Sequence, residues 1–211
     1  MNPDSSSGPG VRRLRERQRE STAQEILTAA EQVFVERGIH SAHMSDIAAR
    51  AGVAVGTLYN HYKDRDALLC ALAAQRRQEM LLIADECLER NKDQPFREQL
   101  TEYWRVIFSY WEKHFQFFCV FMQSENGPPA VAQPSLAIQR EIYKRYEQLV
   151  EVARKQKLLR PKMAKLAPAL LMGMSKSVLM TRLFISDEES PVDQIETLVD
   201  FFLAGSGGKT P

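Results

Sequence analysis

The sequence lacks the motifs that mark most enzymes. It has no GxGxxG or GxxxxGK glycine-rich loop for a nucleotide and no GxSxG motif for a nucleophilic serine. Its one SxxK pattern, Ser206 to Lys209, lies in a glycine-rich tail without a rigid scaffold. No paired carboxylates and no nucleophile–base pair stand out either. We therefore expect no catalytic residues and no cofactor, and a small all-helical enzyme is the weaker interpretation.

Cysteine is scarce and badly placed for cross-linking. The chain has three cysteines, Cys70, Cys87 and Cys119, widely separated and without a CxxC pair. This pattern predicts neither a disulfide framework nor a zinc site and fits a reducing cytoplasm. His40 and His43 lack a third nearby ligand, so we expect no metal.

Long apolar runs are also missing. The most apolar segment, residues 166–185, is interrupted by Pro168, Lys176 and Arg182 and is better explained as a buried helix than as a membrane span. The first ten residues contain no apolar stretch, so we expect a flexible leader rather than a signal peptide. The expected protein is soluble and cytoplasmic, without a membrane partner.

The net charge of +1 gives no sign of a nucleic-acid partner. One short segment does, because residues 11–19 hold five arginines and one glutamate. Such a basic arm can neutralise phosphates, although a solvated and partly disordered leader is the alternative interpretation.

Glycine and proline, ten of each, are scattered, and between them run amphipathic stretches that predict an all-α protein. The first helix is expected to begin at a Ser21 cap and to end at Gly38, and Asp64 should cap a long helix. The other expected helices cover residues 44–51, 55–62, 64–91, 95–112, 114–125, 134–157, 162–185 and 191–204.

The segment MSDIAARAGVAVGTLYNHY predicts a helix-turn-helix. Ile47, Ala48 and Leu58 can meet inside it, and Gly52 suits the left-handed backbone at the end of the first short helix. An ordinary helical hairpin is the alternative. The second short helix turns hydrogen-bonding side chains and no carboxylate outward, which suits a polyanion.

Residues 21–70 resemble the DNA-binding domain of the tetracycline-repressor (TetR) family, most specifically in DIAARAGVAVGTLYNHYKDRDALL. The resemblance implies an N-terminal three-helix DNA-binding domain and a C-terminal helical domain for effector binding and dimerisation. The implied organisation is a flexible basic leader (1–20), a helix-turn-helix domain (21–66), an effector-binding and dimerisation domain (67–204) and a flexible tail (205–211).

The resemblance also implies which residues contact double-stranded DNA. Base edges would be contacted by Val55, Gly56, Thr57 and Asn60. Phosphates would be contacted by Tyr59, His61 and Lys63. Two positions depart from the family pattern. Ser45 is also a candidate DNA contact, at a position from which a longer side chain, frequently arginine, often reaches bases in the family. His43 stands where a serine or threonine usually caps the helix.

Two aromatic stripes between residues 96 and 122 recur at helical spacing and predict buried faces. Core packing is the simpler explanation, and an apolar cavity with a few polar groups is the functional one. A small-molecule effector would then contact Tyr103, Trp104, Phe108, Trp111, Phe118 and Met122.

The helices expected over 162–185 and 191–204 are too apolar for a single buried face. The family resemblance implies that they pair into a homodimer, and a thicker monomer core is the alternative. The whole pattern predicts a transcriptional regulator that a small hydrophobic or aromatic effector releases from a palindromic operator, most simply a repressor. An activator with the same DNA-binding domain is the alternative.

Overall fold

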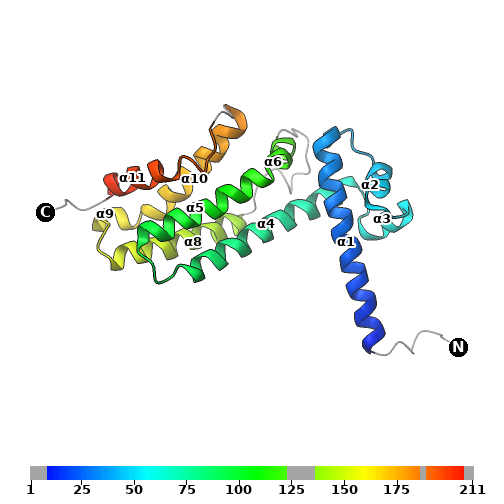
Figure 1. Cartoon of the computed structure of the whole chain (residues 1–211), viewed down its shortest axis with the longest axis horizontal. Coiled ribbons are helices and arrows are strands. Elements are labelled where there is room, and N and C mark those ends of the chain that lie inside the picture. The colour runs from blue at the N-terminus through cyan, green and yellow to red at the C-terminus, as the bar shows by residue number, and fades with distance from the viewer. Residues whose placement is uncertain (1–8, 123–135, 186–188, 207–211) are drawn as a thin grey trace. The chain divides into compact units, whose positions relative to one another are not determined.

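The computed structural model describes residues 9–122, 136–185 and 189–206, and ten helices lie in these ranges (Figure 1). The predicted all-α class is confirmed. The chain divides into two compact units, one holding residues 9–75 and 120–122 of the described chain and the other holding 76–119 and the described residues from 136 onward. The predicted domain boundaries stay predictions.

The first unit is a small bundle of α1 (Pro9–Arg37), α2 (Met44–Ala51), α3 (Val55–His61) and the first turns of α4 (Arg65–Arg90). Both short helices lie within one residue of their predicted bounds. Side chains from all four helices form the core, and its fully buried members include Ile26, Ala30, Phe34, Ile47, Ala48, Leu58, Leu68 and Leu72.

The start of α1 differs from the prediction. The helix begins at Pro9, twelve residues before the expected cap at Ser21, and the Ser21 hydroxyl lies inside it, 3.4 Å from a carboxylate oxygen of Glu25. The arginine-rich segment is therefore helical from Pro9 onward. Residues 1–8 of the predicted flexible leader and 207–211 of the predicted flexible tail lie outside the described residues.

The second unit packs the rest of α4 and the later helices around an aromatic core. The later helices are α5 (Phe96–Lys113), α6 (Phe115–Met122), α8 (Leu136–Lys155), α9 (Pro161–Ala164), α10 (Ala167–Phe184) and α11 (Ile195–Ser206), and α6 belongs to this unit as far as Cys119. The helix predicted over 162–185 is instead two helices. Proline lacks a backbone N–H and fits the first turn of a helix, so α10 starts afresh around Pro168 after the short α9.

Three further predicted helix ends are wrong or fall outside the described residues. Residues 191–194 form turns, so α11 begins at Ile195 rather than at residue 191. The end predicted for the 114–125 helix and the start predicted for the 134–157 helix fall outside the described residues.

In the described chain, every helix is too short or too polar to cross a membrane.

Candidate nucleic-acid interface

The turn between α2 and α3 is set by Gly52. Its φ of 69° places it in the left-handed region, where its amide donates to the Ala49 carbonyl at 3.2 Å and the Val53 amide donates to the Ala48 carbonyl at 3.0 Å. A residue with a Cβ is sterically strained in this conformation, whereas glycine adopts it freely. The predicted helix stop is confirmed, and it fixes where α3 begins.

Two arginines join α2 to the end of α1. Arg37 at the end of α1 lies 2.5 Å from Asp46 in the first turn of α2. The Arg50 guanidinium donates to both carboxylate oxygens of Glu36, at 2.6 and 2.7 Å. This paired hydrogen bond lowers the pKa of Glu36 below its usual value of 4.5. The sequence did not point to these pairs, because the partners lie 9 and 14 residues apart with no local pattern.

The start of α4 is anchored in the same way. The Asp64 carboxylate accepts a hydrogen bond from the Ala67 amide at 2.7 Å, which confirms the predicted cap. The Arg65 guanidinium donates to the His40 carbonyl at 2.8 Å. The loop before α2 and the start of α4 are therefore tied together.

Helix α3 buries one side and exposes the other. Leu58 has no exposed surface, whereas Val55, Gly56, Tyr59 and Asn60 are exposed. Thr57 and His61 are half-buried at the edges of this face. No residue of α3 carries a carboxylate, so the exposed face offers polar tips and backbone to a partner without repelling an anion.

The cation that follows α3 is fully accessible. The side chain of Lys63 is 82% exposed, and its ammonium lies 3.6 Å from an Asp64 carboxylate oxygen. A salt bridge this exposed is weak, so a phosphate can replace the carboxylate as the partner of Lys63 at little cost.

Ser45 and His43 lie at the start of α2. Ser45 is exposed, so its hydroxyl is accessible to a partner. His43 has the extended backbone of a helix cap, but its imidazole makes no capping hydrogen bond. It thus occupies the position of the serine or threonine of the family pattern without performing the capping.

The six residues predicted to contact an effector fall into two groups. Tyr103, Trp104, Phe108 and Trp111 belong to the core of the second unit, while Phe118 packs at its edge and Met122 is exposed. Trp111 stacks on Phe118 with 4.8 Å between ring centroids. Whether any of the six contacts an effector stays a prediction.

A buried hydrogen-bond chain crosses this aromatic core. The indole N–H of Trp104 donates to the Tyr146 hydroxyl at 3.2 Å, and that hydroxyl lies 2.7 Å from Ser175 Oγ. Ser175 also donates to the Met172 carbonyl at 3.0 Å. The chain links α5, α8 and α10 and satisfies polar groups that would otherwise be costly to bury.

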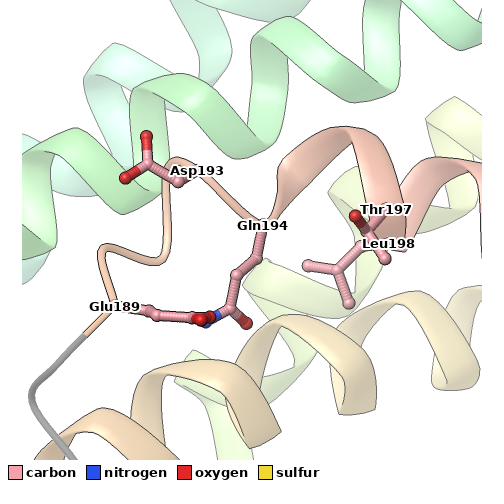
Figure 2. A pocket seen from close by; sticks show the side chains of 5 residues that line it. All are labelled: Glu189, Asp193, Gln194, Thr197 and Leu198. Carbon is pink, nitrogen blue, oxygen red and sulfur yellow. The ribbon is translucent and has the colours of Figure 1, made fainter.

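The surface of the second unit contains a hollow of about 500 Å³ at the start of α11 (Figure 2). It is lined by Glu189, Asp193, Gln194, Thr197 and Leu198, and the Gln194 amide donates to the Glu189 carboxylate at 3.2 Å. Two carboxylates make this hollow a poor match for an apolar effector. In the described residues, no three His, Cys, Asp or Glu side chains come together as a metal site.

Large apolar side chains remain exposed on α10 and α11 and just beyond α10. Leu170 is 36% exposed, Phe184 57%, Ile185 81% and Phe201 73%. These side chains lie on, or directly after, the helices predicted to form the dimer, and the dimer stays a prediction.

Residues 26–72 match the family model of bacterial regulatory proteins of the tetR family. The chain is 28% identical over 130 residues to the HTH-type transcriptional activator FasR of Mycolicibacterium smegmatis, covering 62% of this chain and 57% of that protein. It is 48% identical over 44 residues to the HTH-type transcriptional repressor BepR of Brucella suis, covering 21% of each chain. These matches therefore span at most a little over half of the curated relatives.

Similarity to solved structures covers most of the chain, including the second unit. The transcriptional regulator FadR from Bacillus subtilis, solved in complex with stearoyl-CoA, superposes with a TM-score of 0.69 at 20% identity. The superposition covers 86% of this chain and 98% of that one. At this identity the likeness establishes the fold and leaves the ligand open.

Proposed function

Because this chain belongs to the TetR family of bacterial regulatory proteins, we propose that it is a transcriptional repressor. It acts in the cytoplasm as a homodimer on a roughly palindromic operator, and a small apolar effector releases it. The observation that carries the proposal is α3, which presents an exposed face without a carboxylate above the buried Leu58. No catalytic step is part of this function.

Helix α3 is proposed to enter the major groove. Val55, Gly56, Thr57 and Asn60 then lie nearest the base edges, with Ser45 of α2 beside them. Tyr59, His61 and Lys63 contact phosphates and hold α3 in register. The exposure of Tyr59 and Lys63 and the lack of a strong partner for Lys63 support this division of roles.

The dimer is proposed to form through α10 and α11. The exposed Phe184, Ile185 and Phe201 are buried when a second copy covers them. A two-fold dimer places two copies of α3 in successive major grooves when they lie about 34–36 Å apart, which requires half-sites one helical turn apart.

The effector is proposed to bind within the aromatic core of the second unit. Phe118, which is less buried than the four core residues, marks the way in, and Tyr103, Trp104, Phe108 and Trp111 line the site once it opens. A contact from Met122 stays a prediction. The related fold bound to stearoyl-CoA makes a long acyl chain the first class of ligand to test. The effector binds better to a conformer in which α4 has shifted, and this conformer no longer matches the operator.

Regulation in the opposite direction is the second candidate. One relative is named as an HTH-type transcriptional activator and another as an HTH-type transcriptional repressor. An activator would use the same α3 contacts and differ in how it meets the polymerase.

Selection from a library of random duplexes tests the proposed DNA binding. We expect the purified chain to enrich an inverted repeat whose half-sites lie about 10 base pairs apart from centre to centre. A Tyr59→Ala, Asn60→Ala variant, which alters only the exposed face of α3, is expected to enrich nothing. The absence of any enriched sequence with the wild-type chain would overturn the proposal.

Tryptophan fluorescence tests the effector site. Both tryptophans of the chain, Trp104 and Trp111, lie in the proposed site, so a bound ligand should change the emission of the protein directly. We expect saturable quenching by an acyl-CoA or another apolar ligand, together with loss of operator binding at the same concentration. A ligand that quenches tightly and leaves operator affinity unchanged would contradict the release mechanism.

A further inference from the structure

The first three turns of α1 expose their side chains. Every side chain from Val11 to Ser21 is exposed, and burial begins only further along, at Ile26. These eleven residues extend about 16 Å at the rise of an α-helix. Figure 1 shows them as the dark blue turns of α1 that continue past α2 and α3.

The composition of this extension is unsuited to a free helix end. Residues 9–20 contain five arginines and two glutamates, and the first turn has no acid. Cations oppose the positive end of the helix dipole, so this charge weakens the helix that carries it. The ion pair of Arg12 with Glu16 is 4.0 Å long and exposed, and it offsets little of the cost. The charge is therefore left largely unpaired within the helix and is accessible to a partner.

Three of the arginines form a row on one side of the helix. Arg12, Arg15 and Arg19 follow the spacing of three and four residues that keeps side chains on one face. The same row continues through Ile26, Ala30 and Val33, which are buried against the rest of the first unit. The arginine row thus points to the side of α1 on which α2 packs. Arg13 and Arg17 point to a different side.

We propose that the arginine row, Arg12, Arg15 and Arg19, is a second DNA-contact site that binds backbone phosphates beside the half-site read by α3. The row spans about 10 Å, or roughly three base pairs of duplex. All its cations are guanidinium groups, whose planar fork matches phosphate oxygens better than an ammonium does. This inference rests on the proposed DNA-binding function, because it extends the same interface.

The salt dependence of operator affinity tests the row. Each phosphate contact adds about −0.9 to the slope of log affinity against log salt. Changing Arg12→Gln, Arg15→Gln and Arg19→Gln together should make the slope shallower by about 2 to 3. The Arg13→Gln, Arg17→Gln pair, which removes charge from the other face, should change it by less than about 1. Arginine-to-lysine exchange along the row should keep most of the wild-type slope.

Glutamine is a good helix former, so circular dichroism of the triple variant should match that of the wild type. A triple variant that binds its operator with the wild-type slope would overturn the proposal while leaving the function of α3 intact. Equal flattening by the Arg13 and Arg17 pair would also overturn it, because diffuse charge would then explain the effect. A changed oligomeric state with an unchanged slope would assign the row to a second copy of the chain. Failure of the wild type to bind any DNA would instead remove the proposed function itself.

Discussion

Replacing Gly56 by alanine should stabilise the fold and weaken DNA binding at the same time. Gly56 lies in the first turn of α3 with ordinary helical backbone, and a Cβ built on it meets no atom of the chain within 4 Å. Glycine in a helix costs about 0.5–1 kcal/mol relative to alanine. The variant should therefore gain up to about 1 kcal/mol in the free energy of unfolding. The added methyl lies on the face proposed to approach the bases, so operator affinity should fall at least about tenfold, or ~1.4 kcal/mol.

Gly52→Ala is the matched control, because its Cβ also meets no atom within 4 Å but its φ is +69°. The left-handed backbone costs a residue with a side chain about 1 kcal/mol, so this variant should be destabilised by that amount. Its fold remains mostly populated, and its operator affinity should fall less than that of Gly56→Ala. Urea unfolding at one fixed protein concentration, together with a binding titration, measures both quantities. A Gly56→Ala variant that binds as tightly as the wild type would refute the placement of α3 against the bases.

Three further predictions concern the stability of the two units and the proposed dimer. Arg50 lowers the pKa of Glu36, so the pair stabilises the fold at pH values above the unfolded pKa of 4.5, and this contribution is lost as the pH falls through the lower folded pKa. Arg50→Gln should therefore lose less stability on acidification than the wild type. Identical urea midpoints for the two proteins from pH 6 to pH 3 would contradict this. Burial raises the pKa of Tyr146 from 10.0 to about 12, so the contribution of the neutral hydroxyl to folding stability is present below pH 10 and is lost as the pH rises through 12. Tyr146→Phe should cost about 1–3 kcal/mol of unfolding free energy at neutral pH, because its buried partners are left unpaired. In alkaline unfolding, the variant should lose less further stability than the wild type between pH 10 and pH 12. Phe201→Arg should place a charge in the proposed dimer face and give a monomer in sedimentation equilibrium, and a persistent dimer would exclude α11 from the interface.

The helix-turn-helix could be predicted from sequence because its determinants are local. Gly52 ends α2 where the left-handed turn was expected, and the apolar spacing of Ile47 and Leu58 identified the buried sides of both short helices. The early start of α1 could not be predicted in the same way. Its first three turns have no apolar periodicity, so the pattern that identifies a packed helix was missing there.

The second unit was harder to predict because its features depend on tertiary packing. The aromatic spacing of α5 predicted a buried face, and that face is buried. Spacing alone does not distinguish a ring that fills the core from one that lines a cavity, since both lie on the same side of the helix. The hydroxyl of Tyr146 between Trp104 and Ser175 likewise depends on three helices meeting, with partners 42 and 29 residues away in sequence.

The arginine contacts of the first unit also depend on tertiary packing and could not be predicted from sequence. Arg50 and Arg65 contact Glu36 and the His40 carbonyl across sequence separations of 14 and 25 residues. Nothing in the neighbouring residues indicates these partners. They become recognisable only when α1, α2 and α4 are placed together.

Tyr59, His61 and Lys63 are proposed to position α3 on DNA through contacts with phosphates. The most direct test of this proposal is a titration of the wild type and the Tyr59→Ala, His61→Ala, Lys63→Ala variant against the enriched duplex and a scrambled one across a salt series. We expect sequence-specific wild-type binding with a steep negative salt slope, and a shallower slope with weaker binding to both duplexes for the variant. Equal wild-type affinity for the two duplexes, or a variant slope as steep as that of the wild type, would contradict the account.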